Sequence, residues 1–402
     1  MFLDVLRRRN PELIRAAVDL HQQGLLPANS YVLDLEQVGV NASLMAAEAR
    51  RLGLTAFAMT KQYGRNPIVT RAVMDAGFSG VVAVDVPCAR PSVDAGIRIG
   101  HIGHLVQVPR HETAEVASWG PDYWTVFNDE HAQWAADVSA ARGSVQALLA
   151  RVTAPGDHFY PGHEGGFAAS DVVALADRID AREGARLAGV TTFPALLFDP
   201  ETGGVRTTPN MATIENCAQA LLDSGRSEVV VNAPGTTSMR AMHVLADAGA
   251  TQVEPGHALT GTTPWHALED LPEGPAMAYV SEISHVHGGR AYFYGGGLYA
   301  DPVLGTYPDA AAGLIGRDAD SLTSVTALLP PASAIDYYGQ IPVADRPPRP
   351  GNTVVLAHRI QAFVTRAYVV PLSGVGRGDP QIEGVWTVDG RQVEARHMDP
   401  RP

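Results

Sequence analysis

Between residues 30 and 254 the chain alternates short apolar runs with segments of helical spacing, and this alternation most constrains its fold. Parallel strands need a crossover between them, which a helix usually supplies. About eight strands separated by helices predict a (β/α)8 barrel of the TIM type, although an open doubly wound sheet fits the same alternation. The expected strands are residues 31–34, a run ending at Lys61, and residues 81–85, 104–108, 124–127, 146–150, 189–193, 229–231 and 252–253.

The pattern changes after Pro264, where strand-like runs are divided by Gly and Pro turns with hardly a helix between them. Such runs predict a separate β domain. A length of 402 residues suits a barrel of roughly 250 residues followed by a second domain. We therefore expect a helical arm over residues 1–28, the barrel over residues 29–264 and the β domain over residues 265–402.

Composition excludes several classes of function. The net charge of −13, with no basic cluster beyond residues 7–9, argues against a nucleic-acid or anionic membrane partner. Cys88 and Cys217 form neither a disulfide framework nor a zinc-binding spacing. With no signal-peptide pattern and no long apolar run, the cytoplasm is the expected location. A small-molecule substrate fits this composition best.

Lys61 is the only lysine among the 30 Lys and Arg residues. An amine with a lowered pKa can condense with an aldehyde to give a Schiff base, whereas a guanidinium cannot. A general replacement of Lys by Arg that left one surface lysine explains the same count. The position of Lys61, after an apolar strand and just before Gly64, favours a chemical role, because active sites of barrels lie at such strand ends.

Two later strand ends carry residues suited to an anion. The run 229–231 leads through Asn232 into Gly235, Thr236, Thr237 and Ser238 and then into a helix, a turn typical of phosphate binding because backbone N–H groups and the helix dipole point at the anion. An ordinary helix N-cap explains the same hydroxyl residues. The next strand ends in Glu254, Pro255, Gly256 and His257, which again places a carboxylate beside a glycine.

Residues 32–41 (VLDLEQVGVN) and 58–64 (AMTKQYG) resemble the opening of the alanine racemase-like, fold-type III family, which uses pyridoxal 5′-phosphate (PLP). More narrowly, the chain through residue 67 is similar to the YhfX-like branch of that family. The resemblance extends over most of the chain and is clearer in the barrel half. It implies a PLP-binding (β/α)8 barrel, a C-terminal β domain and a head-to-tail homodimer whose active sites take residues from the partner.

The resemblance also implies roles for individual residues. Lys61 would hold PLP as an internal aldimine and return as one proton-transfer base, and Tyr63 would lie near the phosphate, although the family's usual spacing between them is longer. The phosphate cradle would consist of Gly235, Thr236, Thr237 and Ser238 with the backbone of Gly256 and His257.

Glu254 departs from alanine racemases, which place an Arg at that position, and matches the Glu-Pro-Gly of ornithine decarboxylase-like members. A carboxylate keeps the pyridine nitrogen protonated, so the ring accepts carbanion charge strongly. Glu254 therefore predicts a well-stabilised quinonoid.

Further positions have candidate roles. Phe193 or Thr192 falls where the family often has a ring-stacking His, and Phe193 as plain barrel core explains the same residue. Tyr294 lies where alanine racemase-like sequences carry the second base, contributed across the dimer; packing on an alternating strand is the alternative. His163 is a candidate for substrate or cofactor contact in a strand-end loop.

We expect no catalytic metal. Related D-threonine aldolase-like sequences have a His and Cys metal site near residues 351–363, where this chain has His358 but no Cys. His285 and His287 lie two apart on one expected strand and so face the same side, which permits a base or a metal pair as well as solvent-facing histidines.

The sequence thus predicts a PLP-dependent amino-acid racemase or epimerase that acts at Cα through a lysine aldimine and a quinonoid. A decarboxylase or β-eliminating lyase of the same fold is the nearest alternative, because Glu254 matches that type better. A PLP carrier without turnover, and a cofactor-free barrel that uses Lys61 for its own Schiff base, are the other two alternatives.

Overall fold

The computed structural model describes residues 1–303, 305–331, 333–343 and 347–394. The chain forms two compact units. One unit, the sheet unit, comprises Met1–Ala42, Lys61–Val73 and His257–Pro402, and the other, the barrel unit, comprises Ser43–Thr60 and Met74–Gly256. Within the described residues, no helix combines the length and the apolar character that crossing a membrane requires.

The barrel unit contains a closed ring of parallel strands, eight in the described part of the chain, in the order β5-β4-β3-β2-β12-β11-β8-β6. Pairing of β5 with β6 closes the ring, which confirms the predicted (β/α)8 barrel and rejects the open sheet. The strands are β2 (Thr55–Met59), β3 (Gly80–Ala83), β4 (Ile99–Ile102), β5 (Tyr123–Val126), β6 (Gln146–Thr153), β8 (Ala185–Thr191), β11 (Val230–Asn232) and β12 (Gln252–Val253).

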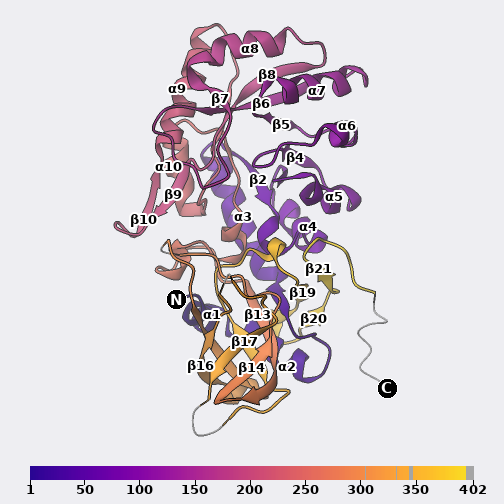
Figure 1. The fold of residues 1–402 in the computed structure, drawn as a ribbon, viewed down its shortest axis with the longest axis vertical. Helices are drawn as coiled ribbons and strands as arrows, with labels where there is room; N and C mark the ends of the chain where they lie inside the picture. Colours follow the sequence, from indigo (N-terminus) through magenta and orange to yellow (C-terminus); the bar gives the residue numbers. More distant parts are fainter. Residues whose placement is uncertain (304, 332, 344–346, 395–402) are drawn as a thin grey trace. The chain divides into compact units, whose positions relative to one another are not determined.

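Helices cover the outside of the barrel (Figure 1). Their sequences explain this placement, as in α8, where Val172, Leu175, Ala176 and Ile179 are buried on one face at helical spacing. Asp85 caps α5 by accepting a hydrogen bond from the backbone of Cys88. The helices of this unit are α3 (Leu35–Arg51, from its second half), α5 (Val86–Asp94), α6 (Thr113–Trp119), α7 (Asp129–Ala140), α8 (Val172–Asp180), α9 (Pro209–Asp223) and α10 (Met242–Asp247); α4 (Pro67–Asp75) follows β2.

Close strand packing at Gly189 allows a test of the barrel. A Cβ added at Gly189 in β8 would lie 1.9 Å from the carbonyl oxygen of Val230 in β11. We expect Gly189→Ala to lower the free energy of unfolding by about 3 kcal/mol, because backbone cannot move aside cheaply. Gly39→Ala is the control, because nothing lies within 4 Å of a Cβ added at that position in α3. This substitution should raise the free energy of unfolding by about 1 kcal/mol, since alanine favours a helix more than glycine does. Urea denaturation measures both changes in the free energy of unfolding. Equal changes in the two variants would contradict the close packing of Gly189 against Val230.

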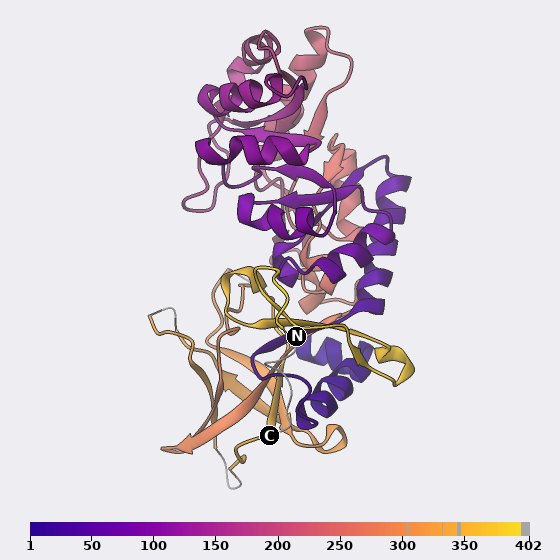
Figure 2. The same cartoon turned by 90° about the vertical axis from the view of Figure 1, so that its right-hand side faces the viewer.

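The sheet unit contains a sheet in the order β14-β17-β16-β15-β18-β13-β1-β19-β20, with β21 paired to β19. Its described pairings are antiparallel except that of β1 with β19, which is parallel. Helices α1 (Phe2–Arg9) and α2 (Pro11–Gln22) lie beside it (Figure 2). Leu13 and Ala17 of α2 share an apolar core with Val280 and Val355 of the sheet. The strands are β1 (Ser30–Asp34), β13 (Met277–His287), β14 (Arg290–Tyr294), β15 (Ala310–Gly316), β16 (Thr323–Leu328), β17 (Tyr338–Pro342), β18 (Thr353–Leu356), β19 (Tyr368–Ser373), β20 (Gln381–Ile382) and β21 (Trp386–Thr387).

Two expected strands differ from the structure. The run 31–34 forms β1, but β1 pairs with β13 and β19 of the sheet unit and not with the barrel. Every residue of β1 is buried, and an apolar run of this kind does not indicate which sheet the strand joins. The third barrel strand is Ile99–Ile102, and the expected strand 104–108 is a loop. Gly103, at φ +77°, ends β4. The apolar residues after Gly103 predicted a strand there, whereas the short strand before it contains Gly and His and gave a weaker pattern.

Candidate active site

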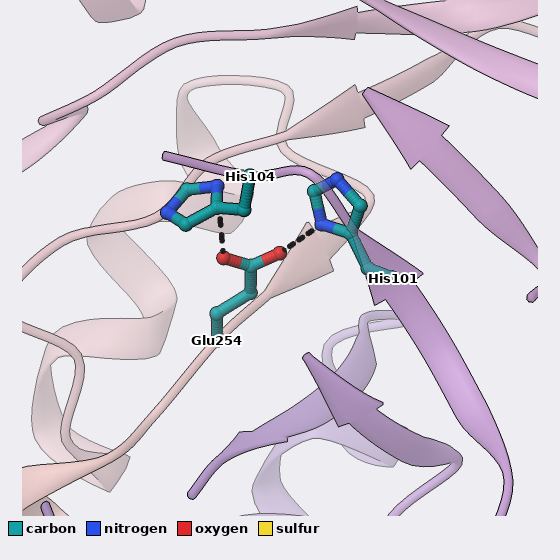
Figure 3. Close-up of side chains that lie close together, drawn as sticks. All are labelled: His101, His104 and Glu254. Atoms are coloured by element: carbon teal, nitrogen blue, oxygen red, sulfur yellow. Dashed lines mark hydrogen bonds and ion pairs between the residues drawn. The ribbon is translucent and has the colours of Figure 1, made fainter. Parts of the chain in front are cut away.

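Glu254 is the centre of a buried polar group at the end of β12 (Figure 3). Its Oε1 accepts hydrogen bonds from His101 Nδ1 at 2.5 Å and from Asn232 Nδ2 at 2.9 Å. His104 Nδ1 lies 3.4 Å from Oε2 of the same carboxylate. The side chains of His101 and Glu254 are fully buried, and His104 is 1% exposed.

The barrel explains how these residues meet. His101 lies on β4, His104 follows that strand by two residues, and Asn232 is the last residue of β11. Parallel strands of a barrel end at one rim, so residues far apart in the chain converge there. His101 Nε2 lies 2.6 Å from Thr125 Oγ1 on β5, which joins another strand to the group.

Glu254 is an anion at neutral pH. Burial by itself raises the pKa of this carboxyl group, but the charges of His104 and His101 and the hydrogen bonds from His101 and Asn232 outweigh it and lower the pKa to about 2. A buried carboxylate is stable only when such donors compensate its lost hydration. The group can therefore offer a fixed negative charge at the barrel rim.

Among the predicted cofactor-binding residues of the barrel unit, two buried side-chain atoms have no hydrogen-bond partner within the described residues: Glu254 Oε2 and Ser238 Oγ. An unmet acceptor or hydroxyl in a buried place costs free energy, so each is suited to a ligand. Oε2 can accept from a protonated ring nitrogen, and the Ser238 hydroxyl can donate to a phosphate. These atoms fit the chemistry of PLP.

The turn before Ser238 has a close backbone approach. Gly235 bridges to Leu196 of the short strand β9 (Leu196–Asp199), and a Cβ at Gly235 would lie 2.3 Å from the Leu196 carbonyl oxygen. Glycine is therefore required at that position. Ser238 precedes a short 3-10 helix, Met239–Ala241, that continues into α10. The turn follows β11 and Glu254 follows β12, and these neighbouring strands bring both to the same rim.

Arg151, which no sequence pattern indicates, is a buried cation in this unit. It lies on β6, is 1% exposed, and donates through Nη2 to the carbonyl oxygen of His163. Nε and Nη1 have no hydrogen-bond partner within the described ranges. Burial lowers the pKa of Arg151 to about 10, with Glu164 acting in the opposite direction, so the group stays charged at neutral pH. A buried guanidinium with unused donors is suited to a carboxylate.

Aromatic rings lie beside His104. Phe193 follows β8, and its ring centroid is 5.6 Å from His104, 5.8 Å from Tyr160 and 6.0 Å from His163. This arrangement brings His163, a predicted contact residue, into the same group as Phe193. Whether Phe193 stacks on a cofactor stays a prediction.

Lys61 belongs to the sheet unit, where it begins the 3-10 helix Lys61–Tyr63, two residues after β2 ends at Met59. It is partly buried, and its Nζ lies 5.3 Å from the ring centroid of Phe363, within the range of a cation–π contact. Tyr63 is fully buried, and burial raises the pKa of its phenol. A Cβ at Gly64 would meet Val369 Cγ2 at 2.6 Å, which explains the glycine after Tyr63.

His257 and Tyr294 also lie in the sheet unit. His257 is buried, with Nε2 2.9 Å from the carbonyl oxygen of Ile360. Burial, followed by the charge of Arg359, holds the pKa of His257 well below its usual range, so Nε2 of the neutral ring donates to that carbonyl. Tyr294 is the last residue of β14, is 40% exposed, and its ring centroid lies 5.9 Å from that of Tyr338. The predicted residues of the barrel unit are Gly235, Thr236, Thr237, Ser238, Glu254 and Gly256.

The histidines considered for a metal have other surroundings. His285 is exposed, and its ring stacks on Tyr292 at 4.6 Å. His358 is fully buried, which lowers the pKa of its imidazole to about 4. In the described part of the chain, one group of His, Cys, Asp or Glu residues has the spacing of metal ligands: His101, His104 and Glu254. The expected absence of a catalytic metal stays a prediction.

Three residues of the rim were missed from sequence: His101, His104 and Arg151. The spacing His101-Ile-Gly-His104 was the available signal, but it required β4 to be placed at Ile99–Ile102. Arg151 gave no signal, since its burial follows only from the tertiary structure.

A closed parallel barrel with an anionic carboxylate, two histidines and an arginine at or near its strand ends defines a barrel enzyme, because the active sites of this fold lie at that face. Family models give the particular family. The model of the alanine racemase N-terminal domain matches residues 33–264, and the model of the YhfX-like C-terminal domain matches residues 278–382.

Individual proteins agree with these models. Uncharacterized protein YhfX of Escherichia coli (strain K12) is 39% identical over 403 residues, which covers 98% of this chain and 100% of that protein. The chain therefore belongs to the YhfX-like branch of the alanine racemase-like family, whose members use PLP.

Solved structures show the same fold at low sequence identity. D-threonine aldolase from Filomicrobium marinum has a TM-score of 0.65 and 17% identity, over 90% of this chain and 95% of that one. D-threo-3-hydroxyaspartate dehydratase from Delftia sp. HT23 has a TM-score of 0.63 and 17% identity, over 89% of this chain and 96% of that one. Alanine racemase from Clostridium difficile 630 has a TM-score of 0.60 and 12% identity, over 90% of this chain and 99% of that one.

Proposed function

We propose that this protein is a PLP-dependent enzyme that removes and returns the proton at Cα of an amino acid, as a racemase or epimerase. Family membership supports the cofactor and the amino-acid substrate. The observation that carries the PLP-dependent chemistry, whichever reaction follows, is Glu254, a buried anion whose Oε2 has no hydrogen-bond partner among the described residues. PLP, when bound, supplies a ring that accepts the electron pair left at Cα.

The chain's own residues divide the remaining work. Lys61 holds the cofactor's aldehyde and then takes or returns the Cα proton from one side. Glu254 keeps the ring nitrogen protonated by offering it Oε2. Tyr294 acts as the acid or base of the opposite side, contributed by the partner of a homodimer. The residues that would bind the phosphate are Tyr63, the turn Gly235, Thr236, Thr237 and Ser238, and, through their backbone N–H groups, Gly256 and His257.

Arg151 binds the substrate carboxylate in this proposal, because two of its nitrogens have no hydrogen-bond partner among the described residues and its charge persists at neutral pH. We expect Arg151→Gln to raise KM for the amino acid roughly ten- to a hundredfold, the loss of one charge-assisted hydrogen bond. Arg186→Gln is the matched control, an exposed arginine on the neighbouring strand β8, and should leave KM unchanged. An unchanged KM in Arg151→Gln of wild-type thermal stability would contradict this role.

Glu254 favours a second candidate, a decarboxylase or β-eliminating lyase. A carboxylate at the ring nitrogen makes a strong electron sink, which those reactions use more fully than racemisation does. Binding of PLP without turnover is the remaining alternative.

Incubation of the purified protein with a panel of amino acids in deuterated water tests these functions. A racemase exchanges the Cα hydrogen for deuterium, yields the opposite enantiomer or epimer, and releases neither carbon dioxide nor ammonia. Release of carbon dioxide indicates the decarboxylase, and release of ammonia the lyase. PLP binding with no exchange on any substrate would reject the catalytic proposal in favour of a carrier.

A further inference from the structure

The two histidines around Glu254 have no part in the function proposed so far. His101 and Asn232 both donate to Oε1, so both lone pairs of that oxygen are occupied. Oε2 has no hydrogen-bond partner within the described residues, and His104 Nδ1 lies 3.4 Å from it. The carboxylate is therefore held by hydrogen bonds on Oε1, whereas Oε2 has only the longer ion-pair contact with His104 (Figure 3).

The hydrogen bonds of His101 also determine its tautomer. Nδ1 faces a carboxylate, which can only accept, so Nδ1 carries a proton. Nε2 then accepts from the Thr125 hydroxyl at 2.6 Å when the ring is neutral. Thr125 on β5, His101 on β4 and Glu254, directly after β12, thus form a chain of hydrogen bonds in which each member orients the next.

We propose that His101 and His104 are positioning residues that keep Glu254 ionised and turn its Oε2 toward the protonated ring nitrogen of the cofactor. This inference rests on the proposed function for the identity of the ligand, but not for the arrangement of the three side chains. His101 fixes the plane of the carboxylate, with Thr125 behind it. His104 adds positive potential on the side of Oε2.

The same three residues have the spacing of metal ligands, but their bonds favour the hydrogen-bonded arrangement. Both ring nitrogens of His101 already have partners, and its Nδ1 would have to lose its proton to bind a metal. Oε1 is likewise occupied by two donors. A metal would have to break bonds that the structure contains.

Amide variants separate positioning from general packing. The Nδ2 of asparagine occupies about the place of histidine Nδ1, so His101→Asn and His104→Asn keep a donor there, while His101→Leu and His104→Leu remove it. Thr125→Val removes only the hydroxyl behind His101. Each full-length variant is prepared with and without PLP, and circular dichroism confirms that it is folded.

The cofactor-free protein is tested by a carbon-13 NMR titration of its glutamate side chains, in which the signal absent from Glu254→Gln identifies Glu254. We expect the titration midpoint of the Glu254 signal to rise by at least about one pH unit in both Leu variants, which is a tenfold shift of the equilibrium toward the protonated carboxyl group. In the Asn variants the midpoint should stay near that of the wild type. If the Leu variants titrate like wild type, the positioning role is wrong. If the purified wild type contains one equivalent of zinc that His101→Leu lacks, the group is a metal site and the inference is also wrong.

The PLP-bound protein is tested with PLP labelled with nitrogen-15 in its ring. The shift of that nitrogen should indicate a protonated ring in wild type and in the Asn variants, and a ring that has lost protonation in His101→Leu, with Thr125→Val between them. A ring equally protonated in all variants overturns the inference. If no variant and no wild-type protein binds PLP, the proposed function fails, while the titration of the cofactor-free protein still decides whether the histidines hold Glu254.

Discussion

Lys61→Ala is expected to abolish covalent retention of PLP and to lower turnover roughly ten-thousandfold or more, because no other lysine exists in the chain to replace its amine. Borohydride reduction followed by peptide mass spectrometry measures the first effect, and the deuterium-exchange assay measures the second. Wild-type protein should carry the reduced cofactor on the peptide that contains Lys61. Its absence from every peptide of the variant is the expected result.

Lys61→Arg is the matched control for this experiment. A guanidinium keeps the positive charge and the contact with the Phe363 ring, yet cannot condense with an aldehyde. The Arg variant should therefore have wild-type thermal stability and no covalent cofactor. Borohydride-reducible PLP in the Ala variant would remove Lys61 from the proposal.

Glu254→Gln is expected to lower turnover about a hundred- to a thousandfold, which is the usual effect of removing one preorganised charge from an active site. Glutamine has nearly the same shape and still accepts from His101 and Asn232 through its carbonyl oxygen, so the loss measures charge and not packing. Glu183→Gln, at an exposed acid of the barrel unit, is the control and should retain full turnover. Turnover of Glu254→Gln within threefold of wild type would show that the charge is not used.

The same substitution changes the stability of the protein in acid. The folded state lowers the pKa of Glu254 from its ordinary 4.5 to about 2, so ionised Glu254 stabilises the fold above pH 4.5 and this contribution disappears as the pH falls to about 2. The difference in unfolding free energy between wild type and Glu254→Gln should shrink by roughly 3 kcal/mol across that range. Urea denaturation at several pH values measures it, and a constant difference would contradict the lowered pKa.

Much of the fold could be predicted from local pattern. Strands such as Tyr123–Val126 and Gln146–Thr153 are short apolar runs between helices, so their type and order follow from residues close in the chain. The prediction was wrong where the local pattern of a strand did not indicate which strands it pairs with. Residues 30–34 have the same apolar character as a barrel strand, but β1 joins strands more than 240 residues away in the chain.

The candidate site shows the same division. Lys61 and Glu254 could be identified because each is a chemically distinctive residue at the end of an apolar run, beside a glycine turn. Arg151 could not, since an arginine within a strand has no local feature that marks its burial or partner. The His101-Ile-Gly-His104 spacing could be used only with β4 placed at Ile99–Ile102. The charge of Glu254 depends on both histidines, and no local pattern contains that information.

The sequence by itself determined the alternation of strands and helices, the single reactive amine and the carboxylate in place of an arginine, because periodicity and residue chemistry are local properties. Only the tertiary structure decided which sheet received β1 and that His101 lies against Glu254, 153 residues away. The physical reason is that barrel closure brings distant strand ends to one rim, where burial and hydrogen bonding then determine the ionisation of each side chain.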